Sequence, residues 1–273
     1  MAMAARGPEF AVMEQVAKDL KIARELALRT TMHVVGGGSL MALDQAGLMG
    51  PDIDYVHLMK ITDQEAKRLK DSGGTASVSP TMELKGTRWR GEAPATARLL
   101  RNGVVPSLSA DSESGSPGDM FSMMRVALLA GRHAASNPEE GVASPADPAQ
   151  WNAASLIPLR SVLEMATIAG ARSLGLERET GSLTPGKAAD IILLDAGRLN
   201  HFPLNDAVGA VVMGADVASV EAVFVAGKPV KFGGRLVDQA LVARARRLAT
   251  ESRDWLFAKA GVALPEGLSG KSG

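Results

Sequence analysis

The stretch Thr31-Met32-His33-Val34-Val35-Gly36-Gly37-Gly38 sets the pattern from which the fold follows. Its first five residues are apolar or β-branched apart from one histidine, which favours a short buried strand, and the three glycines predict a sharp turn at that strand's carboxyl end. Apolar residues recur at mostly helical spacing from Glu9 to Arg29 and predict a helix before the strand. A second helix, from Ser39 to Ala46, completes one unit of an α/β fold.

The same unit recurs along the chain. Ile53 to Leu58 reads as a second strand, and Thr62 to Asp71 as a helix whose Thr62 and Glu65 match a capping box. Three helices and two strands are predicted next: strands from Ala76 to Val78 and Val104 to Leu108, and helices from Pro94 to Asn102, Gly118 to His133 and Leu159 to Leu174. Alternating strands and helices of this length predict a parallel sheet with right-handed crossovers.

The remaining segments are of other kinds. We expect Met1 to Ala5 to be structureless and Asn137 to Asn152 to form a surface loop. Beyond the last α/β helix the pattern predicts a turn, a strand, a hairpin and a charged helix: Gly181 to Gly186, Asp190 to Asp195, Val220 to Val225 with Pro229 to Phe232, and Leu241 to about Ala258.

Composition excludes several classes of protein. Thirty Lys and Arg balance thirty Asp and Glu, so no long-range field gathers nucleic acid or an anionic membrane. No apolar stretch approaches the roughly 18 to 20 residues that a membrane helix needs. We therefore expect a cytoplasmic protein without a nucleic-acid or membrane partner. Cysteine is absent, so any metal must be held by His and carboxylate ligands.

Three side chains with metal-ligating chemistry follow predicted strands. His33 lies near the end of the first strand, His57 near the end of the second, and Asp111 just beyond the fourth. Reactive groups collect at the carboxyl ends of parallel strands, so these three could converge on one ion. Imidazole nitrogen and carboxylate oxygen suit zinc, iron or manganese, which lowers the pKa of water enough for hydroxide to attack an electrophilic carbon. The competing interpretation of each histidine is a hydrogen-bonded structural residue.

Other candidates are weaker. Gly36 to Gly38 could cradle a phosphate, but the spacing matches no nucleotide-binding motif and a tight turn is the simpler reading. Glu83 and Glu92 flank the basic stretch Lys85 to Arg90, which could line a substrate mouth or form a solvated loop. The expectations for the remaining polar residues are solvent exposure for His133 and His201, a helix-capping role for Asp119, and no nucleophilic role for Ser109 or Ser112.

The chain resembles the amidohydrolase superfamily, in the branch of cytosine deaminases and triazine hydrolases. The resemblance covers nearly the whole chain and rests on Thr31–Val34, Tyr55–Leu58 with Thr62–Glu65, Pro106–Asp111, Gly118–Phe121, Met165–Arg172, Leu174–Leu176, Gly181–Asp190 and Val225–Val230. It implies strands five to eight of a (β/α) TIM-type barrel over residues 1–178. Residues 179–273 are then a C-terminal β-sandwich segment with a closing helix.

The resemblance also implies a site and a reaction. His33 would be a metal ligand, His57 would orient substrate or water and could ligate metal, and Asp111 would bind metal and accept a proton from the attacking water. The metal would be Zn²⁺ or Fe²⁺. The reaction would be hydrolytic displacement on a small heterocyclic or amide substrate: deamination, dehalogenation or opening of a cyclic amide.

Three departures from the family pattern qualify this expectation. No His-x-His pair is present, Gly36 stands where many members have a proton-shuttling Glu, and Ser79–Glu83 lacks the branch's His-Cys-Pro sequence. We therefore expect a truncated hydrolase that binds metal weakly. Because a half-barrel leaves sheet edges uncovered, we also expect it to form a homo-oligomer. The alternatives are a catalytically silent homologue that acts as an assembly module and a phosphate-binding module.

Overall fold

The structure is a computed structural model that describes residues 1–85, 95–135 and 157–265. Its first sheet has five strands, all parallel and adjacent in chain order: β1 (Ala2–Ala5), β2 (Arg29–Val34), β3 (Ile53–His57), β4 (Thr75–Val78) and β5 (Ser107–Leu108). The helices between and after them are α1 (Met13–Glu25), α2 (Ser39–Gln45), α3 (Asp63–Ser72), α4 (Pro80–Lys85), α5 (Thr96–Arg101), α6 (Met120–Ala135), α7 (Leu159–Met165) and α8 (Ile168–Leu174). The predicted parallel α/β sheet is confirmed.

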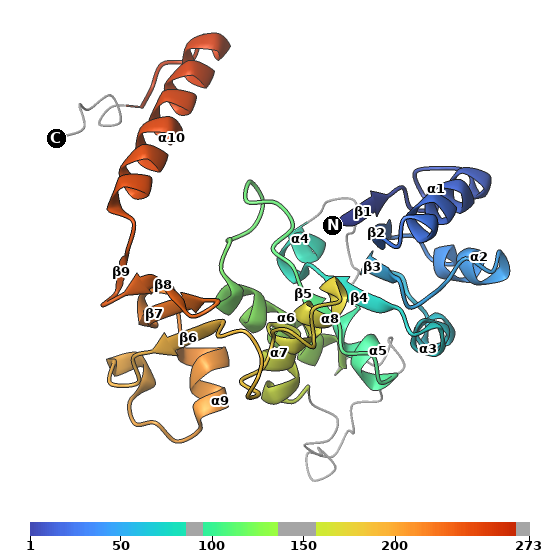
Figure 1. Cartoon of the computed structure of the whole chain (residues 1–273), viewed down its shortest axis with the longest axis horizontal. Coiled ribbons are helices and arrows are strands. Elements are labelled where there is room, and N and C mark those ends of the chain that lie inside the picture. Colours follow the sequence, from blue (N-terminus) through green and yellow to red (C-terminus); the bar gives the residue numbers. More distant parts are fainter. Residues whose placement is uncertain (86–94, 136–156, 266–273) are drawn as a thin grey trace.

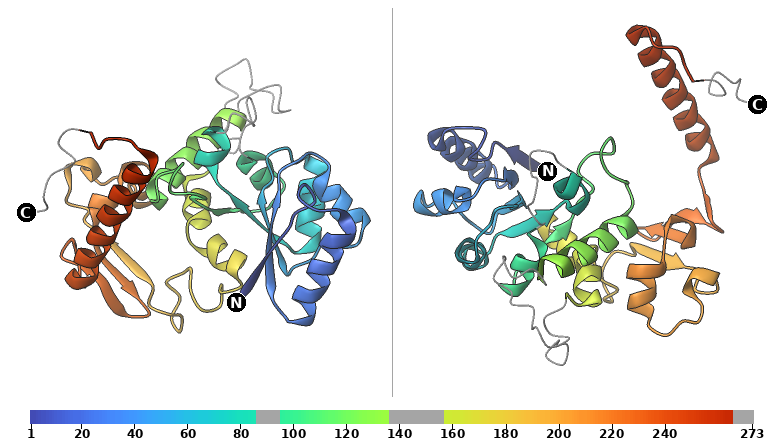
Figure 2. Two further views of the ribbon diagram at one scale, coloured as in Figure 1. Left: turned by 90° about the horizontal axis from the view of Figure 1, so that it is seen from above. Right: turned by 180° about the vertical axis from the view of Figure 1, so that it is seen from behind.

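Alternate residues of the strands face opposite sides of this sheet. In β2, Met32 and Val34 are buried in one core with Leu20 of α1 and Leu40 of α2, whereas His33 is exposed on the other face. Figure 2 shows α1, α2 and α3 along the side that this core occupies. The period of two along a strand, with α1, α2 and α3 packed on one face, therefore fixes which residues reach the opposite face. Part of that opposite face is lined by Gly170, Ser173 and Leu174 of α8.

Polar side chains cross that opposite face near the middle of the strands. Asp54 accepts hydrogen bonds from Thr75 Oγ1 at 2.8 Å and from Ser77 Oγ at 2.6 Å, and Ser77 Oγ lies 2.6 Å from Ser107 Oγ. Asp54 is buried even though a pocket of about 630 Å³ lies over this face. The chain of hydrogen bonds links β3, β4 and β5, so it adds side-chain pairing to a sheet whose last two strands are short.

Several predicted elements differ in the structure. Met1–Ala5 is not structureless: β1 pairs with β2 from Ala2↔Arg29 to Ala5↔Met32, so five parallel strands are present rather than four. The helix expected from Glu9 begins only at Met13, because residues 7–10 form a turn closed by Phe10 N donating to Gly7 O at 2.9 Å. The capping box is confirmed, with Thr62 Oγ1 accepting from Glu65 N at 3.2 Å.

The helix predicted from Leu159 to Leu174 is broken. It divides into α7 and α8 at Thr167, whose φ of −133° and ψ of −96° are not helical. Thr167 Oγ1 donates to Leu163 O at 2.7 Å, so its side chain competes with the backbone of the preceding turn. Helix α4 was not expected, and the predicted surface loop from Asn137 to Asn152 lies outside the described residues.

The C-terminal part has its own antiparallel sheet. Strands β6 (Ile191–Leu194), β7 (Val220–Val225), β8 (Lys228–Phe232) and β9 (Arg235–Leu236) lie in that order, which confirms the expected strand and hairpin. Short helical turns, α9 (Ala207–Gly209) among them, connect β6 to β7. Helix α10 (Gln239–Ala260) has no buried residue and extends away from the rest of the chain (Figure 1). Nowhere in the three described ranges is there a helix long and apolar enough to cross a membrane.

The single tyrosine offers a test of the core. Burial raises the pKa of Tyr55 to about 12 from 10.0, because the core disfavours the charged phenolate; the hydrogen bond from Gly50 N only partly opposes this shift. Burial of the neutral Tyr55 phenol therefore contributes fully to the free energy of unfolding below pH 10, and this contribution is lost as the pH rises towards 12. Tyrosinate absorbance should rise near pH 12 in the parent and vanish in a Tyr55→Phe blank. A rise centred near pH 10 while the circular dichroism remains native would contradict the packing.

Candidate functional site

The three residues expected to form a site lie together at the carboxyl edge of the parallel sheet. His33 is the last residue but one of β2, His57 is the last residue of β3, and Asp111 follows β5. The ring centroids of His33 and His57 are 5.1 Å apart, and His57 Nε2 lies 3.9 Å from Asp111 Oδ2. The side chain of His57 is 13% exposed and that of Asp111 is 36% exposed, so the group is open to solvent on one side.

The backbone is strained at two of these three residues. His57 has a φ of +73°, its neighbour Leu58 a φ of +55°, and Asp111 a φ of +59°. Side chains other than glycine rarely adopt this left-handed region, and each such residue costs about 1–2 kcal/mol. Strain of this kind persists where the surroundings over-determine it and often marks functional positions. The same left-handed backbone also occurs at Ala27 and Ala226, so it describes the local geometry of His57 and Asp111, and their role stays a prediction.

Glu83 makes a contact that the sequence did not predict. It belongs to α4, which begins directly after β4, and it is 1% exposed rather than placed at a substrate mouth. Its Oε1 accepts a hydrogen bond from Ser79 N at 2.7 Å and lies 3.2 Å from His57 Nδ1. Glu92 and the stretch that follows Lys85 lie outside the described residues.

A second carboxylate, Glu9, closes the end of β2. Its Oε1 accepts hydrogen bonds from Val35 N at 2.8 Å and from Gly36 N at 2.7 Å. The adjacent Phe10 ring meets the His33 ring edge to face at 5.9 Å. Because the Glu9 carboxylate already uses the amide of Gly36 and would repel a second anion, the structure favours the tight turn over the phosphate cradle for Gly36–Gly38. Sequence patterns gave no signal for Glu9, which comes from the turn after β1.

The donor chemistry of this edge fits a divalent metal. His33, His57 and Asp111 offer two imidazoles and a carboxylate, a set that suits zinc or iron. His57 has its Nδ1 against Glu83 and its Nε2 towards Asp111, and metal-ligating histidines commonly hold a carboxylate at their second nitrogen. Within the described ranges, however, no three His, Asp or Glu side chains are grouped closely enough to hold an ion as they stand. The residues therefore fit a divalent metal by the chemistry of their donor atoms and by the direction of His57 Nε2 towards Asp111.

Two of the minor candidates agree with expectation. Asp119 caps the start of α6, accepting from Ser122 N at 2.8 Å. His133 is exposed. Ser109 Oγ accepts from Asp111 N at 3.0 Å and so helps to position the Asp111 backbone.

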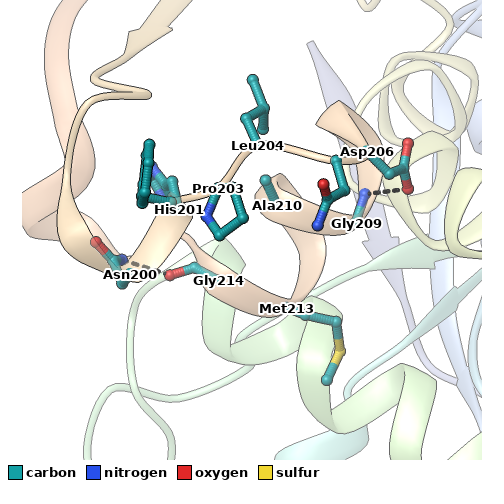
Figure 3. Close-up of a pocket in the computed structure, with 11 residues that line it drawn as sticks. Asn200, His201, Pro203, Leu204, Asp206, Gly209, Ala210, Met213 and Gly214 are labelled. Atoms are coloured by element: carbon teal, nitrogen blue, oxygen red, sulfur yellow. Dashed lines mark hydrogen bonds between the residues drawn. The ribbon is translucent and has the colours of Figure 1, made fainter.

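The expectation for His201 was wrong. It is 6% exposed, with Nδ1 2.8 Å from Asp195 O. His201 and its neighbours line a pocket of about 400 Å³ that is open to solvent (Figure 3). Two hydrogen bonds join residues of its wall: Asn200 donates to Gly214 O, and Asp206 accepts from Gly209 N. The polar residues near Pro203 suggested a surface turn, but the segment Ala210–Gly214 packs over the ring.

The chain shows similarity to known proteins over most of its length. The sequence model of the group described as "Amidohydrolase family" matches residues 3–231. A 5'-deoxyadenosine deaminase of Methanosarcina mazei is 30% identical over 220 residues, which cover 79% of this chain and 46% of that protein. A 5-methylthioadenosine/S-adenosylhomocysteine deaminase of Teredinibacter turnerae is 31% identical over 74% of this chain and 41% of its own length. The chain thus spans about half the length of these curated relatives.

Solved structures show the same partial coverage. An adenosine deaminase from Xanthomonas campestris with bound zinc superposes with a TM-score of 0.78 at 24% identity, covering 93% of this chain and 57% of that one. A mutant atrazine chlorohydrolase from Arthrobacter aurescens, complexed with zinc and atraton, gives a TM-score of 0.74 at 19% identity over 90% and 54% of the two chains. At these identities the likeness shows a shared fold.

Replacement of Gly7 tests the turn that carries Glu9 and Phe10. A Cβ at Gly7 would lie 1.8 Å from His33 O, so Gly7→Ala must displace this turn from β2. We expect a loss of about 1–3 kcal/mol in the free energy of unfolding, measured by urea denaturation. The matched control is Gly170→Ala, where nothing lies within 4 Å and helix α8 should gain about 0.5–1 kcal/mol. Equal stability of the two variants would show that the turn does not press on β2.

Proposed function

Because this chain belongs to the amidohydrolase family, we propose that it carries part of a divalent-metal centre that hydrolyses C–N bonds other than peptide bonds. The observation that carries this proposal is the convergence of His33, His57 and Asp111 at the carboxyl edge of the parallel sheet. Three strands far apart in sequence supply them, as reactive groups are supplied in (β/α) barrels. The deaminase relatives support the C–N class of reaction.

We further propose that residues 1–178 form part of a (β/α) barrel and that residues 179–273 form a C-terminal β-segment with a closing helix. Five parallel strands in chain order with α1, α2 and α3 packed on one face are what one arc of such a barrel requires. The open face over Asp54 and Ser77 is then the inner wall of the barrel. The share of the relatives' length that the chain covers supports a truncated form of the fold.

In this proposal the three residues have distinct tasks. His33 and His57 would supply nitrogen ligands, and Asp111 would supply an oxygen ligand to zinc or iron(II). A divalent ion held there would lower the pKa of a water molecule towards neutrality. The Asp111 carboxylate would take the proton from that water as its oxygen adds to the sp² carbon, and the leaving amine would receive a proton. His57, 3.9 Å from Asp111, would orient the water or the substrate.

The proposed substrate is a small nitrogen heterocycle with an amino or halogen substituent, or a cyclic amide. The relatives named as deaminases of adenosine derivatives favour loss of ammonia, and the atrazine chlorohydrolase favours loss of chloride. A hydrolytic site serves either reaction, because water replaces the leaving group at the same kind of carbon.

A second candidate is a catalytically silent homologue that acts as an assembly module. It is favoured because, in the parts of the chain that the structure describes, the three ligands do not form a closed metal cage. The exposed apolar side chains also fit assembly: Ile192 is 57% exposed, Phe232 64% and Trp255 60%. We propose that the chain forms a homo-oligomer through such surfaces, in either case.

Metal content separates the two candidates. Protein dialysed to equilibrium against zinc should bind close to one ion per chain, and both His33→Ala and Asp111→Ala should lose it, because each removes one of three ligands. The control His133→Ala changes an exposed histidine on α6 and should keep the metal. Elemental analysis that finds no zinc in the parent would leave the silent homologue.

Product analysis then identifies the reaction. Zinc-loaded protein should release ammonia from 5'-deoxyadenosine, and Asp111→Asn should lower this rate by at least about 100-fold because the proton acceptor is removed. Chloride release from a chlorinated triazine, measured in parallel, would instead indicate dehalogenation. A metal-loaded protein inactive on both classes would refute the proposed substrate class.

A further inference from the structure

Glu83 is a carboxylate that the proposed chemistry does not use. At 1% exposure it is among the most buried charged side chains of the described residues, and burying an ionised carboxylate costs several kcal/mol unless neighbours compensate. Its Oε1 has two partners, Ser79 N and His57 Nδ1. Its Oε2 is buried and has no hydrogen-bond partner among the described residues. The contact with His57 is therefore a large part of what stabilises Glu83 in this position.

The contacts of Oε1 indicate which ring nitrogen of His57 carries hydrogen. Ser79 N–H can only donate, so Oε1 is an acceptor at 2.7 Å. An ionised carboxylate has no hydrogen to donate, so its 3.2 Å contact with the imidazole is a hydrogen bond when the hydrogen is on Nδ1. In the neutral ring Nε2 then carries a lone pair and no hydrogen. This is the nitrogen that lies 3.9 Å from Asp111 Oδ2.

We propose that Glu83 is a positioning residue that holds His57 with hydrogen on Nδ1 and with the Nε2 lone pair directed at the candidate metal centre. Three further constraints on the same ring support this role. The backbone of His57 is left-handed, the His33 ring packs at 5.1 Å with a tilt of 31°, and the side chain is only 13% exposed. Glu83 thus completes a set of contacts that leaves the ring one orientation.

The tautomer is a property of the protein alone, whereas its consequence for metal rests on the proposed function. If Nε2 is a ligand, Glu83 keeps that nitrogen free of hydrogen and correctly aimed before the ion arrives. Hydrogen-bond partners of ligating histidines typically contribute 10–100-fold to metal affinity. Removal of Glu83 should therefore weaken zinc binding even though Glu83 itself lies on the far side of the ring from Asp111.

The direct test is the tautomer of His57 in metal-free protein. Long-range ¹H–¹⁵N spectra of ¹⁵N-histidine-labelled protein, recorded above about pH 8 where an ordinary imidazole is neutral, resolve which nitrogen is protonated. A His57→Gln variant identifies the His57 signals among the four histidines. We expect hydrogen on Nδ1 in the parent and in Glu83→Gln, whose amide oxygen still accepts, and a mixture of tautomers in Glu83→Ala.

Glu65→Gln is the matched control, because Glu65 is also a buried glutamate, at 2% exposure, but acts in the capping box of α3. It should lower stability without changing the His57 spectrum. Hydrogen on Nε2 of His57 in the parent, or an unchanged spectrum in a folded Glu83→Ala, would overturn the assignment of Glu83.

Zinc affinity, measured by competition with a chromophoric chelator, gives the second readout. Glu83→Ala should bind zinc 10–100-fold more weakly than the parent, whereas Glu65→Gln should match the parent. The two failures are distinguishable. A parent that binds no zinc but carries hydrogen on Nδ1 refutes the metal centre and leaves the role of Glu83 intact, whereas a zinc-binding parent with hydrogen on Nε2 refutes only the role of Glu83.

Discussion

The parallel pairing of β2 with β3 is the constraint on which the candidate site depends. It sets His33 opposite Val56 and Val34 opposite His57. Burial of Met32 and Val34 against α1 and α2 fixes this register, because a slip of one residue would turn His33 into the core and expose both apolar side chains. The same burial that stabilises the sheet therefore brings one histidine onto the open face and the other to its edge.

The segments that follow the strands bring two carboxylates to the histidines. The turn after β1 brings Glu9 to the amides of Val35 and Gly36, and the helix after β4 brings Glu83 to His57. Left-handed backbone at His57 turns its side chain from the plain alternation of β3, and Asp111, beyond the end of β5, has backbone of the same kind. The site is thus built from the ends of β2 and β3 and from segments that follow β1, β4 and β5, which explains why its geometry depends on the whole sheet and on no single motif.

Sequence predicted the parts of this arrangement that local patterns control. The periodicity around Thr31–Val35 and Ile53–Leu58, the capping box at Thr62 and the hairpin after Val220 each reflect interactions within a few residues. The placement of His33, His57 and Asp111 at one edge follows from strand ends in a parallel sheet. Strand β1 was missed because Met1–Ala5 is small and uniform, and only pairing with β2 makes it extended. Glu9 and Glu83 were missed because each depends on a partner 26 residues away in the sequence. The burial of His201 was missed because it depends on how the later turn at Gly214 packs against its ring.

X-ray absorption at the zinc edge tests most directly whether His33, His57 and Asp111 form one metal centre. In the zinc-loaded chain the three residues predict a shell of nitrogen and oxygen at about 2.0–2.2 Å, with multiple scattering from two imidazoles. In His33→Ala, which should not hold the ion, zinc added at the same concentration should show oxygen neighbours and no imidazole scattering. A parent spectrum with oxygen neighbours alone, or one that His33→Ala leaves unchanged, would contradict a centre at this edge of the sheet.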